Sequence, residues 1–421
     1  MGELAELKRV QEFVDQCMKC GFCTFFCPVY QEEKVETSVA RGKNYLVKLV
    51  LKGEQGFTPE LSKIIGKCLL CKRCVVNCPA KARIDRVVVA ARAQLVEEKG
   101  LGLLKALLFR RIMADRKKFG RLLRIARSLQ GLLPRTEGKI RHLPDFLKAL
   151  GRGRNIPELS RVFLRERVKE VYSPEANTPK LKVGFFTGCA MEFVYPELGL
   201  KVIETLRKTG VEIHVPRSQN CCGAAIYASG DLETARILAY KNIEAMKDVD
   251  MVISGCATCS STLKHYKEYL ARDEKEGEEF ERFSRKVKDL TEFLVDRVEL
   301  DGLRLRGEFQ GKVATWHDPC HLVRYQDIKD QPRRILRSLK GLNYVEMEGA
   351  DLCCGMGGSF SVYHYELSKR IAERKMDSIK QANADIVVTA CPGCMIQLLD
   401  NILRCGMPQR VHHIVELIDT D

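Results

Sequence analysis

The chain has 421 residues, of which 45% are hydrophobic and 30% are charged, so it is long enough to fold as several domains that each bury a core. Most of its 19 cysteines gather in Cys-x2-Cys and Cys-Cys pairs, and the first residues lack an apolar signal core. This pattern indicates metal ligands in a reducing cytoplasm and excludes a small secreted disulfide scaffold. No run of roughly eighteen apolar residues occurs, so we expect no membrane-spanning helix.

The net charge of +15 is concentrated in one part of the chain. Residues 101–170 contain 19 Lys and Arg against 6 Asp and Glu, and the rest of the chain is close to neutral. No motif that reads nucleic acid accompanies this charge, so we expect no nucleic acid among the partners.

Residues 1–100 carry eight cysteines in two runs of the form Cys-x2-Cys-x2-Cys-x3-Cys-Pro. Bacterial two-cluster ferredoxins have this pattern: three cysteines surround one [4Fe–4S] cubane, and the fourth, before the proline, ligates the other. Two zinc sites are the alternative, but zinc ribbons lack the Cys-Pro tail. The pattern assigns Cys17, Cys20, Cys23 and Cys78 to one cubane, and Cys68, Cys71, Cys74 and Cys27 to the other.

The 40 residues between the two runs are a large insertion relative to a minimal ferredoxin. We expect helices around Ser38–Lys52 and Pro59–Gly66. The insertion therefore predicts a helical ferredoxin domain, as in iron–sulfur subunits of quinone-linked dehydrogenases, rather than a compact βαβ domain.

Residues 101–178 contain no cysteine and are typical of basic amphipathic helices, interrupted at Gly131, Pro134, Pro144 and Pro157. Three interpretations of this segment remain open. It is a solvated and partly packed helical face, a helix that docks on a membrane surface or a quinone oxidoreductase, or a surface for an acidic partner subunit.

Residues 179–270 and 311–421 resemble each other and are joined by a charged connector, 271–310, that we expect to be helical. Strands alternate with helices in both, which predicts two small parallel α/β units. Ligands of such units collect beyond the carboxyl ends of the strands, and the repeated cysteines fall there. The expected strands are Lys182–Phe186, Val211–Val215 and Asp250–Ser254, then Lys312–Trp316, Asn343–Met347 and Asp385–Thr389.

Each repeat contains a single cysteine, a Cys-Cys-Gly and a Cys-x2-Cys that opens a helix. The spacings agree between the two repeats to within a few residues, so we treat each set of five cysteines as one site. The sets are Cys189, Cys221, Cys222, Cys256 and Cys259, and Cys320, Cys353, Cys354, Cys391 and Cys394.

These sets resemble the cysteine-rich "CCG" domain of heterodisulfide reductase catalytic subunits and of the iron–sulfur subunits of glycolate oxidase, D-lactate oxidase and anaerobic glycerol-3-phosphate dehydrogenase. The agreement includes residues 219–223, 317–322 and 391–397, and in the ferredoxin part residues 40–46. It covers all of the chain but the basic middle. The resemblance implies an α+β multidomain fold, in which a helical two-cluster ferredoxin domain precedes two tandem α/β CCG domains.

The resemblance also implies that each five-cysteine site can hold a non-cubane [4Fe–4S] centre. Both motifs are complete, which favours two such centres; one centre, or zinc in either domain, is the alternative. The chain has no dinucleotide fingerprint and no P-loop, so we expect no flavin or nicotinamide of its own. Its electrons would come from a partner flavoprotein.

Several further residues stand out near the cysteine motifs or outside them. His317 and His321 flank Cys320, and we expect them to orient the cysteine loop, with iron ligation, proton donation or tuning of the potential as alternatives. Together with Cys353 and Cys354 they are the candidate catalytic residues. We expect surface or strand packing for His412 and His413, and a buried thiol at Cys405.

The function that the sequence favours is electron transfer within a membrane-associated, flavin-dependent dehydrogenase of the 2-hydroxyacid type, acting on glycolate or lactate. Electrons would pass from the flavoprotein partner toward quinone or another carrier. The chain would be cytoplasmic, with peripheral contact to the inner face of the cell membrane through residues 101–170. The alternative is a heterodisulfide-reductase-like subunit that reduces a disulfide at a non-cubane [4Fe–4S] centre.

Overall fold

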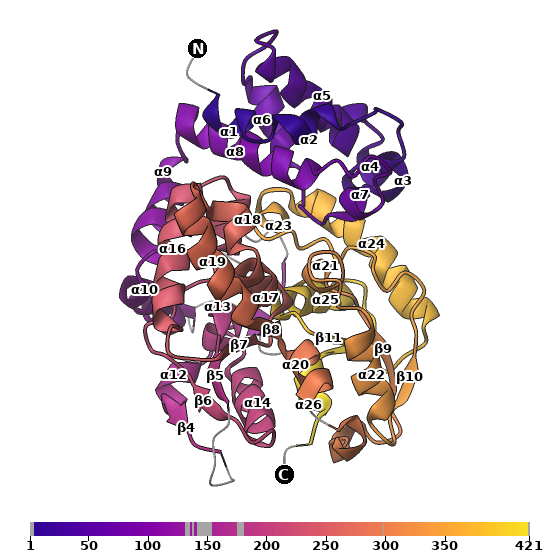
Figure 1. The fold of residues 1–421 in the computed structure, drawn as a ribbon. Helices are drawn as coiled ribbons and strands as arrows, with labels where there is room; N and C mark the ends of the chain where they lie inside the picture. The colour runs from indigo at the N-terminus through magenta and orange to yellow at the C-terminus, as the bar shows by residue number, and fades with distance from the viewer. Residues whose placement is uncertain are drawn as a thin grey trace.

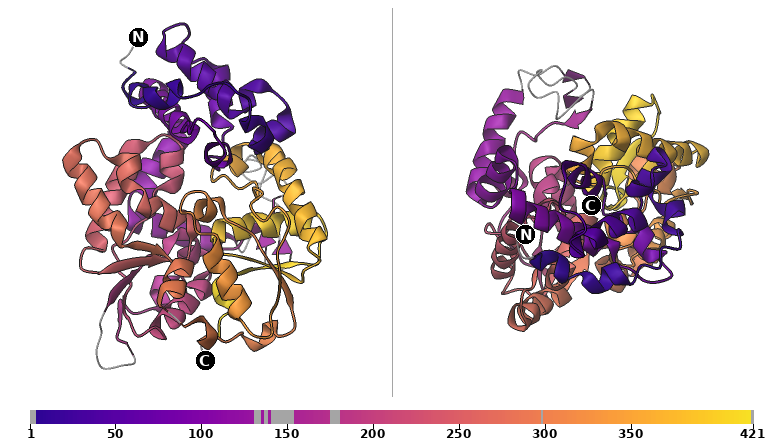
Figure 2. Two further views of the ribbon diagram at one scale, coloured as in Figure 1. Left: turned by 45° about the vertical axis from the view of Figure 1, so that its right-hand side comes forward. Right: turned by 90° about the horizontal axis from the view of Figure 1, so that it is seen from above.

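The computed structural model describes residues 4–130, 135–136, 139–140, 154–174, 181–297 and 299–419. A helical domain lies at one end, and two α/β units lie side by side beneath it (Figure 1). Seen from above, the helical domain lies across both units (Figure 2). This confirms the predicted order of a helical ferredoxin domain followed by two repeated units.

The helical domain is built around the side chains of Leu7, Val47, Ile65 and Val87, all fully buried. Both predicted helices are present, as Ala40–Leu51 and Pro59–Gly66. Thr58 caps the second helix by accepting a hydrogen bond from Leu61 N at 3.1 Å, and a proline stands in its first turn. The elements are α1 (Ala5–Lys8), α2 (Gln11–Asp15), α3 (Cys23–Phe26), α4 (Pro28–Glu33), η1 (Glu36–Ser38), α5 (Ala40–Leu51), α6 (Pro59–Gly66), α7 (Arg73–Val76) and α8 (Ile84–Lys99).

The basic segment continues as α9 (Leu103–Ala106), a π-helical stretch η2 (Leu107–Met113) and α10 (Arg116–Leu129). Ion pairs attach it to the first α/β unit, Arg110 to Asp231 at 3.0 Å and Arg116 to Glu192 at 2.7 Å, and Arg124 pairs with Glu166 of the segment's own later part at 2.8 Å. Part of its positive charge is therefore used in packing. The short elements β1 (Arg135–Thr136), β2 (Lys139–Ile140), β3 (Ile156–Pro157) and α12 (Leu164–Arg167) follow.

Of the predicted helix breaks, Pro157 lies in β3, which pairs antiparallel with β2. Gly131, Pro134 and Pro144 lie outside the described residues.

The first α/β unit has a five-stranded sheet in the order β4-β6-β5-β7-β8, in which only β4 runs antiparallel to its neighbour. All three predicted strands are present. The strands are β4 (Val171–Tyr172), β5 (Lys182–Phe185), β6 (Glu212–His214), β7 (Met251–Ser254) and β8 (Val287–Asp289).

The second unit has a fully parallel sheet in the order β10-β9-β11-β12. This order repeats β6-β5-β7-β8, so the internal repeat predicted from the sequence extends to the topology. The strands are β9 (Val313–Trp316), β10 (Asn343–Val345), β11 (Ile386–Thr389) and β12 (Arg410–His413).

Each unit has a fourth parallel strand that the sequence did not predict. β8 lies within 271–310, for which only helix was expected, and β12 contains His412 and His413. Both strands are short. β8 has three residues and directly joins two charged helices, so its alternation of buried and half-buried residues is too brief to be recognised as a strand in the sequence. Asp289 and His413 occupy matching places, opposite Ser254 and Thr389, and the side chain of each caps the helix that follows.

Helices flank both sheets (Figure 1). No helix in the described parts of the chain is long and apolar enough to cross a membrane. The helices of the first unit are α13 (Gly188–Phe193), α14 (Pro196–Arg207), α15 (Ala224–Ala228), α16 (Leu232–Ala245), α17 (Ala257–Lys264), α18 (Tyr266–Leu270), α19 (Glu274–Lys286) and α20 (Leu290–Arg297). Those that follow are η5 (Leu300–Gly302), η6 (Gly307–Phe309), α21 (Cys320–Val323), α22 (Asp330–Ser338), α23 (Phe360–Tyr363), α24 (Tyr365–Gln381), α25 (Pro392–Arg404) and α26 (Ile414–Leu417).

Candidate metal centres

Three of the four predicted cysteine sites meet at a cavity of about 800 Å³ where the helical domain and both α/β units come together. All ten cysteines of the two repeats line it, as do Cys68 and Cys71 of the helical domain. Each repeat delivers its cysteines from the carboxyl ends of its parallel strands, as the α/β pattern predicts.

The five cysteines of the first unit form one contiguous group. Hydrogen bonds with Cys221 and Cys259 hold the pKa of Cys222 well below its ordinary value. A hydrogen bond with Cys221 raises the pKa of Cys189. Gly188 makes this approach feasible, because its φ is +66° and an added Cβ would lie 2.9 Å from Cys259 Sγ.

The second unit repeats this arrangement. Cys354 Sγ lies 3.7 Å from Cys394 Sγ, and burial raises the pKa of Cys320 to about 12. Gly355 N–H donates to Cys353 Sγ at 3.4 Å, just as Gly223 N–H donates to Cys221 Sγ at 3.5 Å in the first unit. The glycine of each Cys-Cys-Gly thus aims a backbone donor at sulfur, an arrangement that stabilises a thiolate.

The two sites adjoin each other. Cys256 of the first unit forms hydrogen bonds with Cys259, which lowers its pKa, and with Cys391 of the second unit, which raises it. Burial adds to the second effect, and the pKa of Cys256 lies well above the ordinary thiol value. Thr258 Oγ1 lies 3.4 Å from Cys391 Sγ, and Ala257 N–H donates to Ala390 O at 3.0 Å. The carboxyl ends of β7 and β11 therefore bring the two cysteine sets into contact across the interface between the units.

In the helical domain, Cys27 lies among the cysteines of the other run. Burial raises the pKa of Cys27 to about 11, and its thiol interacts electrostatically with Cys68 and Cys71. Cys74 interacts with the same three cysteines. The structure thus brings together the four cysteines that the crossed ligand pattern assigns to one cubane.

The other ferredoxin site is nearer the surface. Cys20 is exposed, whereas Cys17, Cys23 and Cys78 are partly buried. Cys17 interacts electrostatically with Cys23, and burial raises the pKa of Cys23.

The second α/β unit holds the loop that carries Cys71. Arg324 Nε donates to Cys71 O at 2.7 Å, and the Tyr325 hydroxyl donates to Leu70 O at 2.6 Å. The thiols of Cys320 and Cys353 both interact with that of Cys71. The deeper ferredoxin site therefore borders the second five-cysteine site directly.

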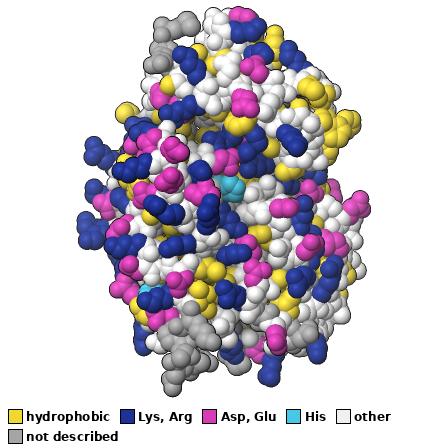
Figure 3. Space-filling model, in the orientation of Figure 1, with side chains coloured by type: hydrophobic (Ala, Val, Ile, Leu, Met, Phe, Trp, Pro, Cys, Tyr) yellow, Lys and Arg dark blue, Asp and Glu magenta, His cyan; other side chains and the backbone are white. Residues whose placement is uncertain are grey.

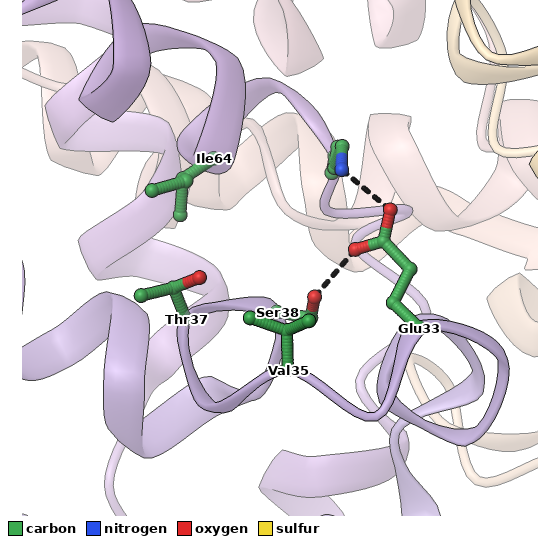
Figure 4. A pocket seen from close by; sticks show the side chains of 6 residues that line it. Glu33, Val35, Thr37, Ser38 and Ile64 are labelled. Atoms are coloured by element: carbon green, nitrogen blue, oxygen red, sulfur yellow. Dashed lines mark hydrogen bonds and ion pairs between the residues drawn. The ribbon is translucent and has the colours of Figure 1, made fainter.

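A smaller pocket of about 280 Å³ lies behind the deeper ferredoxin site (Figure 4). The Glu33 carboxylate lies between Ser38 and Lys67, and both donate hydrogen bonds to it. Burial opposes its ionisation, but these two bonds hold the pKa of Glu33 below its ordinary value. Cys27 Sγ lies 3.6 Å from Ser38 O, so this polar group supports the backbone beside Cys27 rather than offering free ligand groups.

The histidines singled out in the sequence differ in their surroundings. His317 is buried at the end of β9, beside Cys354 and Cys394. His321 stacks on Tyr325 with ring centroids 4.4 Å apart, and its Nδ1 lies 3.3 Å from Ser261 Oγ. His413 is fully buried, and its Nε2 lies 2.7 Å from Gly255 O of the first unit. His412 and Cys405 are partly exposed and lie outside the cavity lining.

Sequence reasoning missed the arginines that join the parts. Arg92 donates to the carbonyls of Ile65, Gly66 and Cys68 and, at 2.6 Å, to Ala228 O of the first unit. Arg154, from the basic segment, lines the cavity and donates to Gln397 Oε1 at 3.1 Å. Their partners are far away in sequence, so no local pattern distinguishes them from the surface arginines of the same chain.

The residues present fit iron–sulfur clusters. Soft thiolate donors are grouped in fours and fives, glycine loops leave room beside the sulfur atoms, and backbone N–H groups point at sulfur. This donor set is the one that known iron–sulfur proteins use.

Two family models match the chain. One is a 4Fe-4S dicluster domain at residues 13–82, and the other a cysteine-rich domain, CCG, that matches twice, at residues 183–264 and 314–399. A crystal structure of a hypothetical protein from Helicobacter pylori shares the fold, with a TM-score of 0.52 at 12% identity over 98% of this chain and 75% of that one.

Three relatives cover different shares of the chain. A subunit of the fumarate reductase (CoM/CoB) of Methanothermobacter marburgensis is 28% identical over 96% of this chain and 71% of its own. "Lactate utilization protein A" of Geobacillus kaustophilus is 35% identical over 57% of this chain and 99% of its own. "Probable glycolate oxidase iron-sulfur subunit" of Bacillus subtilis is 30% identical over 98% of this chain and 97% of its own. The chain is thus a [4Fe–4S]-binding electron-transfer subunit, a member of the CCG iron–sulfur subunit family to which this Bacillus subtilis protein belongs.

Proposed function

We propose that the chain carries electrons along four metal sites arranged in one line. The line begins at the exposed site of Cys20, continues through the site of Cys71 and the second five-cysteine site, and ends at the first. The observation that carries this proposal is the closeness of the last three sites: Cys320 and Cys353 pack against the hydrophobic cluster that contains Cys71, and Cys256 forms a hydrogen bond with Cys391.

The cofactors we propose are a cubane [4Fe–4S] cluster at each ferredoxin site and a non-cubane one at each five-cysteine site. Such clusters supply one-electron transfer when bound. The protein holds the sites next to each other, and Arg324 and Tyr325 fix the loop at the junction between the second and third. The N–H donors of Gly223 and Gly355 favour the charged form of the cysteines beside them.

The surface around Cys20 suits a flavoprotein partner. Phe22, Phe25 and Val76 are 46%, 73% and 53% exposed, and hydrophobic side chains gather at the upper right of Figure 3, where Figure 1 places α3 and α7. An exposed apolar patch at the start of the line is what a docking partner that delivers electrons would bury. The names of the glycolate oxidase and lactate utilization relatives support a partner that oxidises a 2-hydroxyacid.

The cavity that the last three sites share suits a lipid-soluble acceptor such as quinone. Leu101 and Lys105 line the cavity, and between them Leu103 and Leu104 are 92% and 77% exposed. Exposed leucines next to a basic helix are typical of a segment that lies in a membrane interface. We propose that this surface rests peripherally on the inner face of the membrane and that the cavity receives the acceptor from it.

The test is purification of the intact protein without oxygen, together with its native partner. We expect a flavoprotein to co-purify, and glycolate or D-lactate to bleach the iron–sulfur absorbance. Retention of full absorbance with both substrates, while dithionite still bleaches it, would refute the 2-hydroxyacid assignment.

Reduction of a disulfide is the second candidate, favoured by one observation. The cavity opens on both five-cysteine sites, and Cys189 is exposed within it, so a thiol or disulfide can reach the site. The relative named for CoM and CoB adds support. Turnover of a mixed disulfide with an artificial donor, lost in Cys353→Ala or Cys354→Ala, would establish this function in place of a pure relay.

A further inference from the structure

His317 is held rigidly at the end of β9. Its backbone N–H donates to Val388 O at 2.9 Å, and Thr389 Oγ1 donates to its carbonyl at 3.2 Å. The residue is only 1% exposed. Both bonds come from β11, so the strand pairing of the second sheet fixes where the imidazole lies.

By geometry, neither ring nitrogen has a hydrogen-bond partner in the described part of the chain, although the ring interacts electrostatically with the Cys354 thiol. A buried polar group without a partner is costly and rare in native proteins, so its presence indicates an interaction with something that occupies the space beside it. Two of the neighbours are cysteines: a ring nitrogen, Cys354 Sγ and Cys394 Sγ all lie within 4.8 Å of one another.

The spacing of the two sulfur atoms suits a shared metal. Cys354 Sγ and Cys394 Sγ are 3.7 Å apart. Two thiolates at about 2.3 Å from one tetrahedral metal ion lie roughly 3.8 Å apart. The imidazole is therefore placed beside a pair of sulfur atoms that already have the separation of two ligands of one metal.

The first unit provides an internal comparison. Phe186 lies three residues before Cys189, as His317 lies three residues before Cys320. Phe186 N–H donates to Ile253 O, the bond that matches that of His317 to Val388, and its side chain is fully buried. The same position thus has an apolar ring in the first unit and an unpartnered imidazole in the second.

We propose that His317 supplies an imidazole nitrogen to the metal that Cys354 and Cys394 hold, so that the second CCG centre has a mixed thiolate and imidazole ligand set and the first has thiolates alone. This rests on the proposed iron–sulfur centres. A neutral imidazole donates less charge to iron than a thiolate, and histidine ligands raise the potential of Rieske clusters. The second CCG centre therefore has a higher reduction potential than the first, whose ligands are thiolates alone.

The test uses the intact protein with 15N-labelled histidine, reconstituted without oxygen, and pulsed EPR on the second centre. In the native protein we expect a strong histidine-nitrogen coupling. His317→Phe should abolish this coupling and should also lower the midpoint potential of the second centre. Phenylalanine is chosen because the first unit accommodates it at the matching position. The control is His413→Asn, which replaces a buried histidine whose ring nitrogens are both hydrogen-bonded, and it should leave coupling and potential unchanged.

Two results would overturn the assignment. A second centre that is fully loaded with iron but shows no histidine coupling contradicts the role of His317 and leaves the relay intact. Absence of iron from the second unit, by metal analysis and EPR, contradicts both the ligand assignment and the proposed relay.

Discussion

At the scale of single residues, the structure gives each cysteine of the repeats a defined neighbour. Cys256 and Cys391 stand where the two units touch, and Cys71 stands where the helical domain meets the second unit. These three cysteines connect sites that are otherwise separate in the sequence. The spacing rules predicted the membership of each site, but contacts between sites depend on how the units pack, which no motif encodes.

Replacing Cys27 tests the crossed ligand pattern. Because Cys27 lies among Cys68, Cys71 and Cys74, we expect Cys27→Ala to disturb the EPR signal of that cubane and to leave the other signal unchanged. Cys20→Ala is the matched control and should have the opposite effect. Loss of the Cys20 site's signal in Cys27→Ala would refute the pairing.

At the scale of elements, the predicted helices and strands of the ferredoxin domain and both repeats are present, because turn, cap and alternation signals agree there. The fourth strands were missed since β8 has three residues and follows a charged helix directly. Their ends nonetheless stabilise the fold: Asp289 caps α20 by accepting from Thr291 N at 2.9 Å, and also accepts from Ser260 Oγ at 2.9 Å.

Asp289 should make stability depend on pH. Burial raises the pKa of Asp289 from 3.8 to about 6. Between these two pH values the folded protein keeps a proton on Asp289 that the unfolded chain has lost. Stability therefore falls as the pH rises from about 4 to about 6, by roughly 3 kcal/mol in total at about 1.4 kcal/mol per pKa unit.

Asp289→Asn keeps the cap and should remove this loss, so its urea midpoint should exceed that of the native chain at pH 7.5 and by less at pH 5. Far-UV circular dichroism without oxygen measures both midpoints. Asp296→Asn, on the 51% exposed side chain in α20, is the control and should retain the native pH dependence. An equal change in both variants would contradict the role given to Asp289.

The basic segment yields the second prediction at this scale. Lys117 and Arg121 are exposed on α10, whereas Arg110, Arg116 and Arg124 are engaged in ion pairs. Reversing Lys117 and Arg121 to Glu should weaken binding to anionic vesicles, since each basic residue near such a surface contributes on the order of 1 kcal/mol and salt screens it.

The matched control reverses Lys275 and Lys340, two exposed lysines of α19 and the α22–β10 loop, and changes the net charge equally. Vesicle sedimentation at low and high salt measures the difference between the two variants. Equal binding by both would assign α10 to packing or to a protein partner instead of the membrane.

At the scale of the whole molecule, the sequence predicted the helical ferredoxin domain, the two α/β units and the type of cofactor. The structure shows how these three parts are arranged. Two arginines hold the junction: Arg92 of the helical domain donates to Ala228 O of the first unit, and Arg324 of the second unit donates to Cys71 O. Such contacts are long-range and leave no local pattern. This arrangement is what brings cysteines of three of the four predicted sites to the lining of one cavity.

The most direct test of this line is rapid-freeze EPR on the intact protein with its flavoprotein partner, comparing the native chain with Cys27→Ala after addition of glycolate or D-lactate. In the native chain we predict that both ferredoxin signals appear before the CCG centres change. In Cys27→Ala we predict that the Cys20 site is still reduced while the CCG centres stay oxidised on the same timescale. Reduction of the CCG centres at the native rate in that variant would contradict the proposed order and show that electrons enter the two units without passing the site of Cys71.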